Sequence, residues 1–210
     1  GSTHSSLHAN MMPLAFGIVP QNHKKSVTDF IKTRGMACSV YGSQYLLEGL
    51  YNSNEAQYAL DLITETENDR SWWNMIQNGA TMTLEAWDVK YKPNSDWNHA
   101  WGTAPLNITT RYMWGIKPKI AGFKVAEIKP QLADLTFSKI QVPTKNGVII
   151  AIFKKDNNAH NYTITIPNNM TAEFTVPPNF MLIEFNGKKL KSTNNLIHLK
   201  SGNHTIKLKH

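Results

Sequence analysis

The feature that most constrains the fold of this chain is a change in the spacing of its apolar residues near Lys117-Pro118. Before that point, apolar side chains recur every three or four residues, which is typical of helices with one buried face. After it, they alternate with polar side chains, which is typical of strands in a half-buried sheet. The pattern therefore predicts a multidomain chain that is all-α in its first half and all-β in its second.

The first half is predicted to form helical hairpins. Short connections such as Asn52-Ser53-Asn54 separate its helical segments, and short connections place consecutive helices antiparallel. A last helix is expected at about 104–113. The clearest apolar stripes contain Tyr41, Tyr45, Leu46, Leu50 and Tyr51, and then Tyr58, Ala59, Leu62 and Ile63.

The second half is predicted to form a small antiparallel β-sandwich. Asn146-Gly147 and Asn186-Gly187 are hairpin signals, because both residue types tolerate the positive φ of a type I′ turn. Several short strands at this spacing favour two packed antiparallel sheets. Strands are expected at 148–153, 162–166, 180–185, 196–199 and 205–208.

One segment of the helical half, 69–98, has no clear helical period. Long irregular segments are uncommon in compact domains and are usually functional, and rigid helices are a common support for functional loops. Tryptophans gather here: Trp72, Trp73, Trp87 and Trp97 lie inside the segment and Trp101 follows it. We therefore expect the functional site in this segment.

Glu85, in the stretch GATMTLEAWD (79–88), is the candidate working carboxylate. Its neighbours Leu84, Ala86 and Trp87 are apolar, and limited solvation would raise the pKa of the carboxyl toward values suited to proton transfer. The alternative is a glutamate at the start of a helix, where the helix dipole favours a negative charge. The residues alone leave both interpretations open.

Four further positions near Glu85 have a functional and a structural interpretation. Asp88 is either an orienting partner of the carboxylate or a turn residue, and the turn is favoured because Asp is common at element ends. His99, in NHAWG, is either a partly buried structural histidine or a hydrogen-bond donor to a ligand hydroxyl. Trp87 and Trp97 flank these residues and rank first among the tryptophans for stacking on a ligand, although tryptophan also fills cores.

Composition argues against several other classes of protein. No apolar run approaches the roughly 18 residues of a membrane-spanning helix. The single Cys38 excludes an internal disulfide and a cysteine zinc cluster, and the eight histidines show no metal-binding motif, so no metal or cofactor is expected. The net charge of +7 arises largely from lysines scattered along the strand-like half, which is how sheet edges are commonly protected. Without a nucleic-acid-reading motif, that charge does not predict nucleic-acid binding.

Taken in order, several segments make the chain resemble bacterial α-L-rhamnosidases of glycoside hydrolase family 78. They are GSQYLLEGLY, ALDLI, SWWNMIQNGATMTLEAWD, NHAWGTAPLNITTRYMWGIKP, GFKVAEIKPQ and LTFSKIQVPTKNGVI. The resemblance covers essentially the whole chain but only the C-terminal part of such an enzyme. It implies that residues 1–118 are the closing part of an (α/α)6 toroid and that residues 119–210 are a C-terminal β-sandwich.

The resemblance also implies a function and its residues. Family members remove terminal α-linked L-rhamnose with inversion of the configuration at the anomeric carbon. Glu85 matches their general base, and His99 matches a histidine that contacts the sugar. The general acid lies upstream in the family and nothing here matches it, so the chain alone is expected to be inactive. The implied partners are a rhamnose-containing oligosaccharide or glycoside and the remainder of the catalytic domain, in a periplasmic or extracellular location. Two alternatives stay open: a non-catalytic carbohydrate-binding or structural module, and a toroid glycosidase for another sugar.

Overall fold

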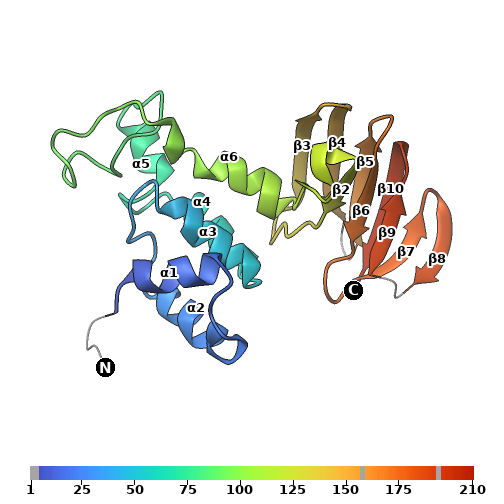
Figure 1. The fold of residues 1–210 in the computed structure, drawn as a ribbon, viewed down its shortest axis with the longest axis horizontal. Helices are drawn as coiled ribbons and strands as arrows, with labels where there is room; N and C mark the ends of the chain where they lie inside the picture. The colour runs from blue at the N-terminus through green and yellow to red at the C-terminus, as the bar shows by residue number, and fades with distance from the viewer. Residues whose placement is uncertain (1–4, 157–158, 193–194) are drawn as a thin grey trace. The chain divides into compact units, whose positions relative to one another are not determined.

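The computed structural model describes residues 5–156, 159–192 and 195–210 and separates into two compact units, Gly1–Ile108 and Thr109–His210 (Figure 1). The first unit is helical and the second is built from strands, as the change of period predicted. The proposed domain limits, 1–118 and 119–210, lie slightly further along the chain than the division into compact units. They stay a prediction.

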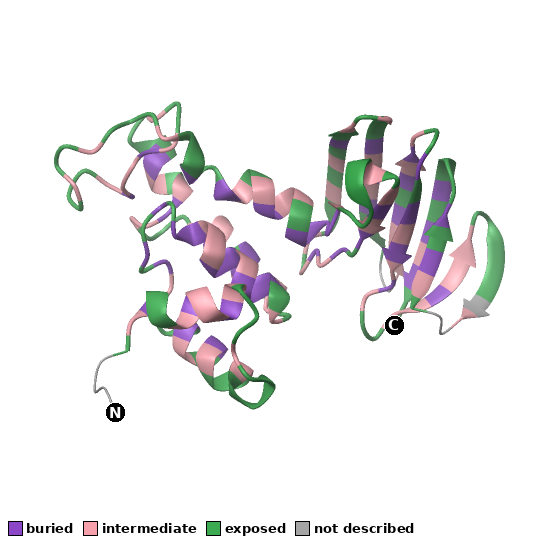
Figure 2. Cartoon of the chain, in the orientation of Figure 1, coloured by how far each residue is buried: buried purple, intermediate pink, exposed green. Residues whose placement is uncertain are grey.

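The helical unit is organised around α3, which contacts α1, α4 and α6. Leu46, Leu47 and Leu50 of α3 are completely buried, and Figure 2 shows the buried positions along this helix. Gly49 permits the close approach of α1, because a Cβ there would lie 3.2 Å from the backbone nitrogen of Ala15. The α-helices are α1 (Leu7–Ala15), α2 (Lys24–Lys32), α3 (Ser43–Asn52), α4 (Ala56–Ile63), α5 (Trp72–Gln77) and α6 (Ala104–Ile108), with 3₁₀ turns at Gln21–His23 and Ala100–Gly102.

Two helical details differ from the sequence prediction. The segment 69–98 contains the short helix α5, whose N-cap Ser71 accepts a hydrogen bond from the backbone N–H of Asn74 at 3.0 Å. A helix of six residues is too short to produce a readable period. The helix expected at 104–113 is present, but it is α-helical only to Ile108 and continues as a π-helix over Thr109–Met113.

The second unit is a sandwich of a four-stranded and a six-stranded sheet. The four-stranded sheet has the order β1 (Lys117–Pro118), β2 (Val125–Ile128), β6 (Thr171–Thr175) and β9 (Leu196–Leu199). The six-stranded sheet has the order β3 (Phe137–Thr144), β4 (Gly147–Asp156), β5 (Ala159–Ile166), β10 (Gly202–Lys209), β7 (Met181–Phe185) and β8 (Lys188–Ser192). All five predicted strands are present, and the pairing is antiparallel as predicted except between β2 and β6, which run parallel. The prediction missed β1, β2, β3, β6 and β8.

Aromatic side chains fill the space between the two sheets. Tyr162 of β5 and Phe174 of β6 meet at 5.0 Å between ring centroids, and Phe153 of β4 lies 5.1 Å from Tyr162. Buried and more exposed positions alternate along β4, β5 and β10, as Figure 2 shows. This alternation is the physical source of the period-two pattern in the sequence.

Only one of the two predicted hairpin turns has the expected type. Asn186 and Gly187 both have positive φ, 50° and 76°, as a type I′ turn requires. At the other hairpin Thr144 pairs with Gly147, so the turn residues are Lys145 and Asn146, and neither has positive φ. The hairpin is confirmed there but the turn type was wrong.

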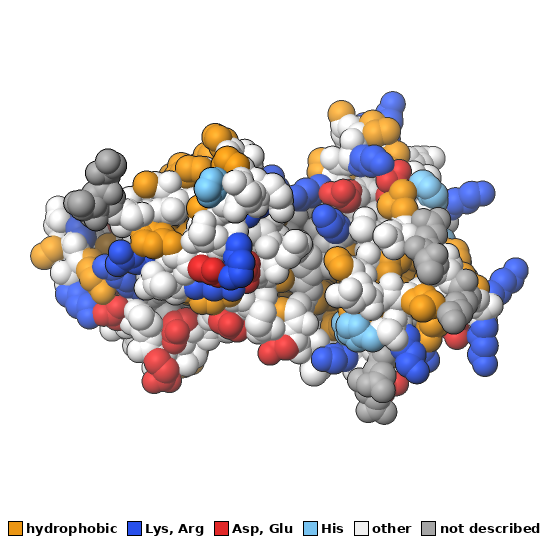
Figure 3. Space-filling view, turned by 90° about the horizontal axis from the view of Figure 1, so that it is seen from below, with side chains coloured by type: hydrophobic (Ala, Val, Ile, Leu, Met, Phe, Trp, Pro, Cys, Tyr) orange, Lys and Arg blue, Asp and Glu red, His pale blue; other side chains and the backbone are white. Residues whose placement is uncertain are grey.

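The cationic side chains on the face seen in Figure 3 do not form one continuous patch. On the face seen in Figure 3, lysines and arginines lie between acidic and uncharged side chains. The expectation that the chain does not bind nucleic acid stays a prediction. Among the described residues, no helix has both the length and the apolar character that crossing a membrane would require.

Candidate active site

The candidate site is built on two segments of the irregular region that run side by side. The backbone N–H of Glu85 donates to the carbonyl of Asp96 at 2.9 Å, and the N–H of His99 donates to the carbonyl of Thr83 at 2.9 Å. The Thr83 hydroxyl donates back to the His99 carbonyl, and the Ser95 hydroxyl accepts from the N–H of Ala86 at 3.2 Å. This pairing brings the side chains of Glu85 and His99 close together.

Residues on either side of Glu85 anchor the first segment in the core. Leu84 and Trp87 are buried, and the Trp87 indole N–H donates to the carbonyl of Cys38 at 2.7 Å. Trp72 meets Trp87 edge-on at 5.0 Å and donates its own indole N–H to the carbonyl of Gly102 at 2.8 Å. The backbone around Glu85 is therefore fixed from inside the unit, while its side chain turns outward. Glu85 does not start a helix, so that interpretation was wrong.

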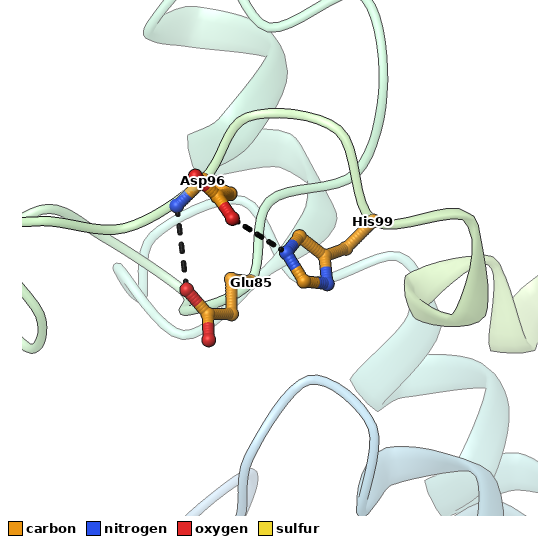
Figure 4. A group of neighbouring side chains, drawn as sticks. All are labelled: Glu85, Asp96 and His99. Carbon is orange, nitrogen blue, oxygen red and sulfur yellow. Dashed lines mark hydrogen bonds and ion pairs between the residues drawn. The ribbon is translucent and has the colours of Figure 1, made fainter.

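The Glu85 carboxylate is held by a cation. Lys92 donates to one of its oxygens in an ion pair, and the backbone N–H of Asp96 donates to the other at 3.3 Å (Figure 4). These contacts, the Lys92 hydrogen bond first, lower the pKa of the Glu85 carboxyl below its ordinary value. Apolar neighbours were expected from the sequence to raise this pKa. That direction was wrong because the hydrogen bonds from Lys92 and from the Asp96 backbone outweigh the effect of burial, which raises the pKa. An ionised carboxylate is suited to accept a proton and unsuited to donate one.

His99 is oriented by Asp96. The His99 Nε2 lies 3.3 Å from the Asp96 carboxylate, as Figure 4 shows. In the tautomer that donates from Nε2 to the Asp96 carboxylate, Nδ1 of a neutral ring is an acceptor. That tautomer would accept from a ligand hydroxyl, whereas the sequence led us to expect His99 to donate to one. A sugar contact at His99 stays a prediction.

Glu85, Asp96 and His99 together place three potential metal-ligand atoms within 4.8 Å of one another. Carboxylate and imidazole are common ligands of divalent cations. However, the Lys92 ammonium already compensates the charge of Glu85, and the Asp96 side chain is 77% exposed. We assign no metal to this group.

Glu85 forms part of the wall of a pocket of about 460 Å³. This volume lies in the range of small-molecule sites. The pocket combines a polar wall with an aromatic one. Its lining residues are His8, Ala37, Cys38, Ser39, Tyr41, Arg70, Glu85, Ala86, Trp87, Tyr91, Lys92 and Trp101.

The aromatic wall differs from the one that the sequence favoured. Trp101 lies 4.7 Å from the His99 ring and 5.5 Å from Tyr41, in edge-on contacts with both, and Trp101 and Tyr41 are exposed. Trp87 lines the pocket but is only 3% exposed, and Trp97 is exposed but is not among the lining residues. Tyr41 was assigned to a buried helical stripe, and that assignment was wrong because its ring faces the pocket. Stacking on a ligand by Trp87 or Trp97 stays a prediction.

Asp88 is a turn residue, as favoured. Its carboxylate accepts from the Asn74 side chain at 2.9 Å and from the backbone N–H of Lys90 at 3.0 Å. These hydrogen bonds, that from Asn74 first, lower the pKa of the Asp88 carboxyl. No contact joins it to Glu85 among the described residues.

Sequence reasoning missed Lys92 and Arg70 as site residues. Both lie in or beside the tryptophan-rich segment, but nothing in their spacing marks them, since lysine and arginine are common on any solvated loop. Lys92 reaches the pocket because the chain turns after residue 88 and places 91–92 beside Glu85, and Arg70 reaches it from the segment just before α5. Only the tertiary fold supplies that information.

Two family models match the chain. A bacterial α-L-rhamnosidase six-hairpin glycosidase domain matches residues 1–113, and a bacterial α-L-rhamnosidase C-terminal domain matches residues 115–185. The chain belongs to the bacterial α-L-rhamnosidase family. It is a C-terminal portion of such a protein, formed by part of an (α/α)6 toroid and a β-sandwich.

Individual rhamnosidases agree with this assignment. An α-L-rhamnosidase of Alteromonas sp. (strain LOR) is 27% identical over 219 residues, which cover 95% of this chain and 23% of that protein. The structure of an α-L-rhamnosidase from Dictyoglumus thermophilum superimposes with a TM-score of 0.86 at 18% identity, over 100% of this chain and 26% of its own. A Streptomyces avermitilis α-L-rhamnosidase solved in complex with L-rhamnose gives a TM-score of 0.78 at 19% identity, over 97% of this chain and 22% of its own. The chain thus spans about a quarter of the length of these rhamnosidases.

Proposed function

We propose that this chain is the C-terminal part of an α-L-rhamnosidase, and that Glu85 is the general base of the parent enzyme. The observation that carries the proposal is a carboxylate kept ionised by Lys92 at the wall of an aromatic pocket, beside His99. A base must be unprotonated before it reacts, and the ion pair favours that state. The substrate would be a glycan or glycoside with a terminal α-linked L-rhamnose.

In an inverting reaction, Glu85 would take a proton from the water that attacks the sugar. A second carboxyl group protonates the leaving oxygen, and the two groups stand about 6.5–9.5 Å apart so that the water fits between them. Asp96 does not meet this requirement, because an oxygen of its carboxylate lies within 4.8 Å of a Glu85 oxygen and its Oδ2 contacts His99. The acid must therefore come from the remainder of the catalytic domain. This is why we expect the 210-residue chain alone to be inactive.

His99 would hold the sugar rather than take part in proton transfer. Its Nε2 is occupied by Asp96, so the neutral ring offers Nδ1 to the hydrogen of a sugar hydroxyl. Among the aromatic residues, the exposed Trp101 and Tyr41 are additional candidates for contact with a pyranose ring, alongside Trp87 and Trp97. Glu85, His99 and these rings would make up this chain's share of the sugar pocket.

The test is Glu85→Gln in the parent enzyme, assayed on an aryl α-L-rhamnoside. Glutamine keeps the size and the hydrogen bonding but does not accept the proton, so kcat is expected to fall about 10²–10⁴-fold while substrate still binds. Glu67→Gln makes the same chemical change at an exposed position away from the pocket and should leave kcat unchanged. The 210-residue chain assayed alongside should show no turnover.

Other results would favour the alternatives. A parent enzyme that turns over another aryl glycoside in preference to the rhamnoside would indicate a toroid glycosidase for another sugar. Binding of rhamnose without turnover by the parent would favour a carbohydrate-binding module. A Glu85→Gln variant whose kcat stays within a few-fold of the wild type would remove Glu85 from the role of base.

A further inference from the structure

Arg70 contributes a positive charge to the Glu85 pocket and forms no ion pair with an acidic side chain of the described residues. It is half-buried and lines the same pocket as Glu85 and Lys92. The neighbouring Asp69 is already engaged, because its carboxylate pairs with Lys90 and accepts from the Tyr91 hydroxyl at 2.9 Å. Across residues 5–156, 159–192 and 195–210, Arg70 forms no ion pair.

The guanidinium is held in position without being neutralised. It lies 4.6 Å from the centroid of the Tyr91 ring, and the Tyr91 hydroxyl is tied to Asp69. The backbone N–H of Arg70 donates to the Asn68 side chain at 2.9 Å, just before α5 begins. A cation–π contact offers modest stabilisation and leaves the N–H donors of the guanidinium free for a second partner.

The charges that line the pocket do not cancel. Lys92 compensates Glu85 in their ion pair, which leaves the charge of Arg70 in excess. A half-buried cation is costly to desolvate, and an anionic partner offsets that cost. A planar guanidinium presents paired donors that match the oxygens of a carboxylate or a sulfate.

We propose that Arg70 binds an anionic substituent, a carboxylate or a sulfate ester, on the sugar next to the one held at Glu85. The natural substrate would then be an acidic saccharide, such as one that contains a uronic acid or a sulfated sugar. This inference rests on the proposed function, because it takes the Glu85 pocket as the substrate site. The rival explanation is that a carboxylate from the remainder of the parent protein pairs with Arg70.

The test compares the parent enzyme with its Arg70→Gln variant on three rhamnosyl disaccharides that differ in charge. One carries glucose, the second glucuronate, and the third sulfated glucose beside the rhamnose. A hydrogen bond to a charged group contributes about 1.5–3 kcal/mol, which corresponds to a fold-change of about 10–150. We expect Arg70→Gln to lower kcat/KM by about that factor on one or both anionic disaccharides and by less than about threefold on the neutral one. The anion with the larger loss identifies the substituent.

Two further variants separate specific binding from a general charge effect. Lys25→Gln also removes one positive charge, but Lys25 is exposed, pairs with Asp29 and is not among the residues that line the pocket, so it should change the three disaccharides alike. Arg70→Lys keeps the charge but not the paired donors, and it should retain part of the preference for the anion. Calorimetric titration of the parent enzyme and its variants with the same disaccharides gives each Kd, and so measures the preference for the anion independently of turnover.

The possible failures are distinguishable. Equal losses on neutral and anionic disaccharides in Arg70→Gln would show that Arg70 pairs with a protein carboxylate, and the inference would be wrong. A wild-type parent without any preference for an anion, in kcat/KM or in Kd, would also overturn it. Absence of turnover on all three rhamnosides would instead contradict the proposed function, and the difference in Kd between wild type and Arg70→Gln would still decide the role of Arg70.

Discussion

Replacement of Gly102 by alanine tests whether the two segments that carry Glu85 and His99 are packed as tightly as the structure indicates. A Cβ at Gly102 would lie 2.8 Å from the Thr83 Cβ and Oγ1 and 2.9 Å from the Val40 Cγ1. Ordinary van der Waals contacts of a Cβ are 3.4–4 Å, so the neighbours must move. Both neighbours are β-branched and stiff about χ1, Val40 is completely buried, and the Thr83 hydroxyl is engaged by the His99 carbonyl.

The expected cost follows from these contacts. Overpacking a well-filled site costs about 1–3 kcal/mol, and a disturbed hydrogen bond at Thr83 costs about 0.5–1.5 kcal/mol more. Alanine recovers about 0.4–1 kcal/mol by restricting the unfolded chain. The free energy of unfolding should therefore fall by roughly 1–3 kcal/mol. With a urea m-value of about 2 kcal/mol per molar, the unfolding midpoint should drop by about 0.5–1.5 M.

Tryptophan fluorescence during urea unfolding measures this change. All tryptophans except Trp114 lie between residues 72 and 101, so the signal reports mainly on the helical unit. Gly42→Ala is the matched control. Its Cβ would meet its nearest neighbours at 3.2–3.3 Å, one of them the flexible end of Met11, so a smaller shift is expected. If Gly102→Ala unfolds at the wild-type urea concentration, the tight contact around Thr83 is refuted.

Two further predictions concern the parent enzyme. Lys92→Met should move the acidic limb of the pH profile of kcat/KM to higher pH, because the Lys92 hydrogen bond lowers the pKa of Glu85 and the base works only when ionised. Lys92→Arg should move the limb less. An unshifted limb in Lys92→Met would contradict the assignment of Glu85 as the base. His99→Ala should raise KM at least as much as it lowers kcat in steady-state kinetics, because His99 is proposed to hold a hydroxyl of the sugar. A fall in kcat at constant KM would instead indicate a role in the transition state.

The sequence by itself determined the architecture. Side-chain spacing follows directly from helix and strand geometry, so the change of period near Lys117-Pro118 was sufficient to predict helices followed by a sandwich. Local turn chemistry also predicted the hairpin at Asn186-Gly187, where both residues adopt positive φ. The short helix α5 was not predicted, because six residues are too few to show a period. The parallel pairing of β2 with β6 was not predicted either. Which strand lies parallel to β2 depends on where the strands lie in the sandwich. The spacing of residues in the sequence does not contain that information.

The sequence also identified part of the site, because GATMTLEAWD and NHAWG resemble family motifs and contain Glu85 and His99. The tertiary structure alone decided what surrounds them. The direction of the Glu85 pKa shift depends on Lys92, which the loop after residue 88 brings to the carboxylate. Its hydrogen bond outweighs the effect of burial that the apolar neighbours suggested. Likewise, Tyr41 from before α3 and Arg70 from before α5 line the same pocket. Electrostatic interactions act across space between side chains, so a list of sequence neighbours does not contain the partners that set the charge state of a site.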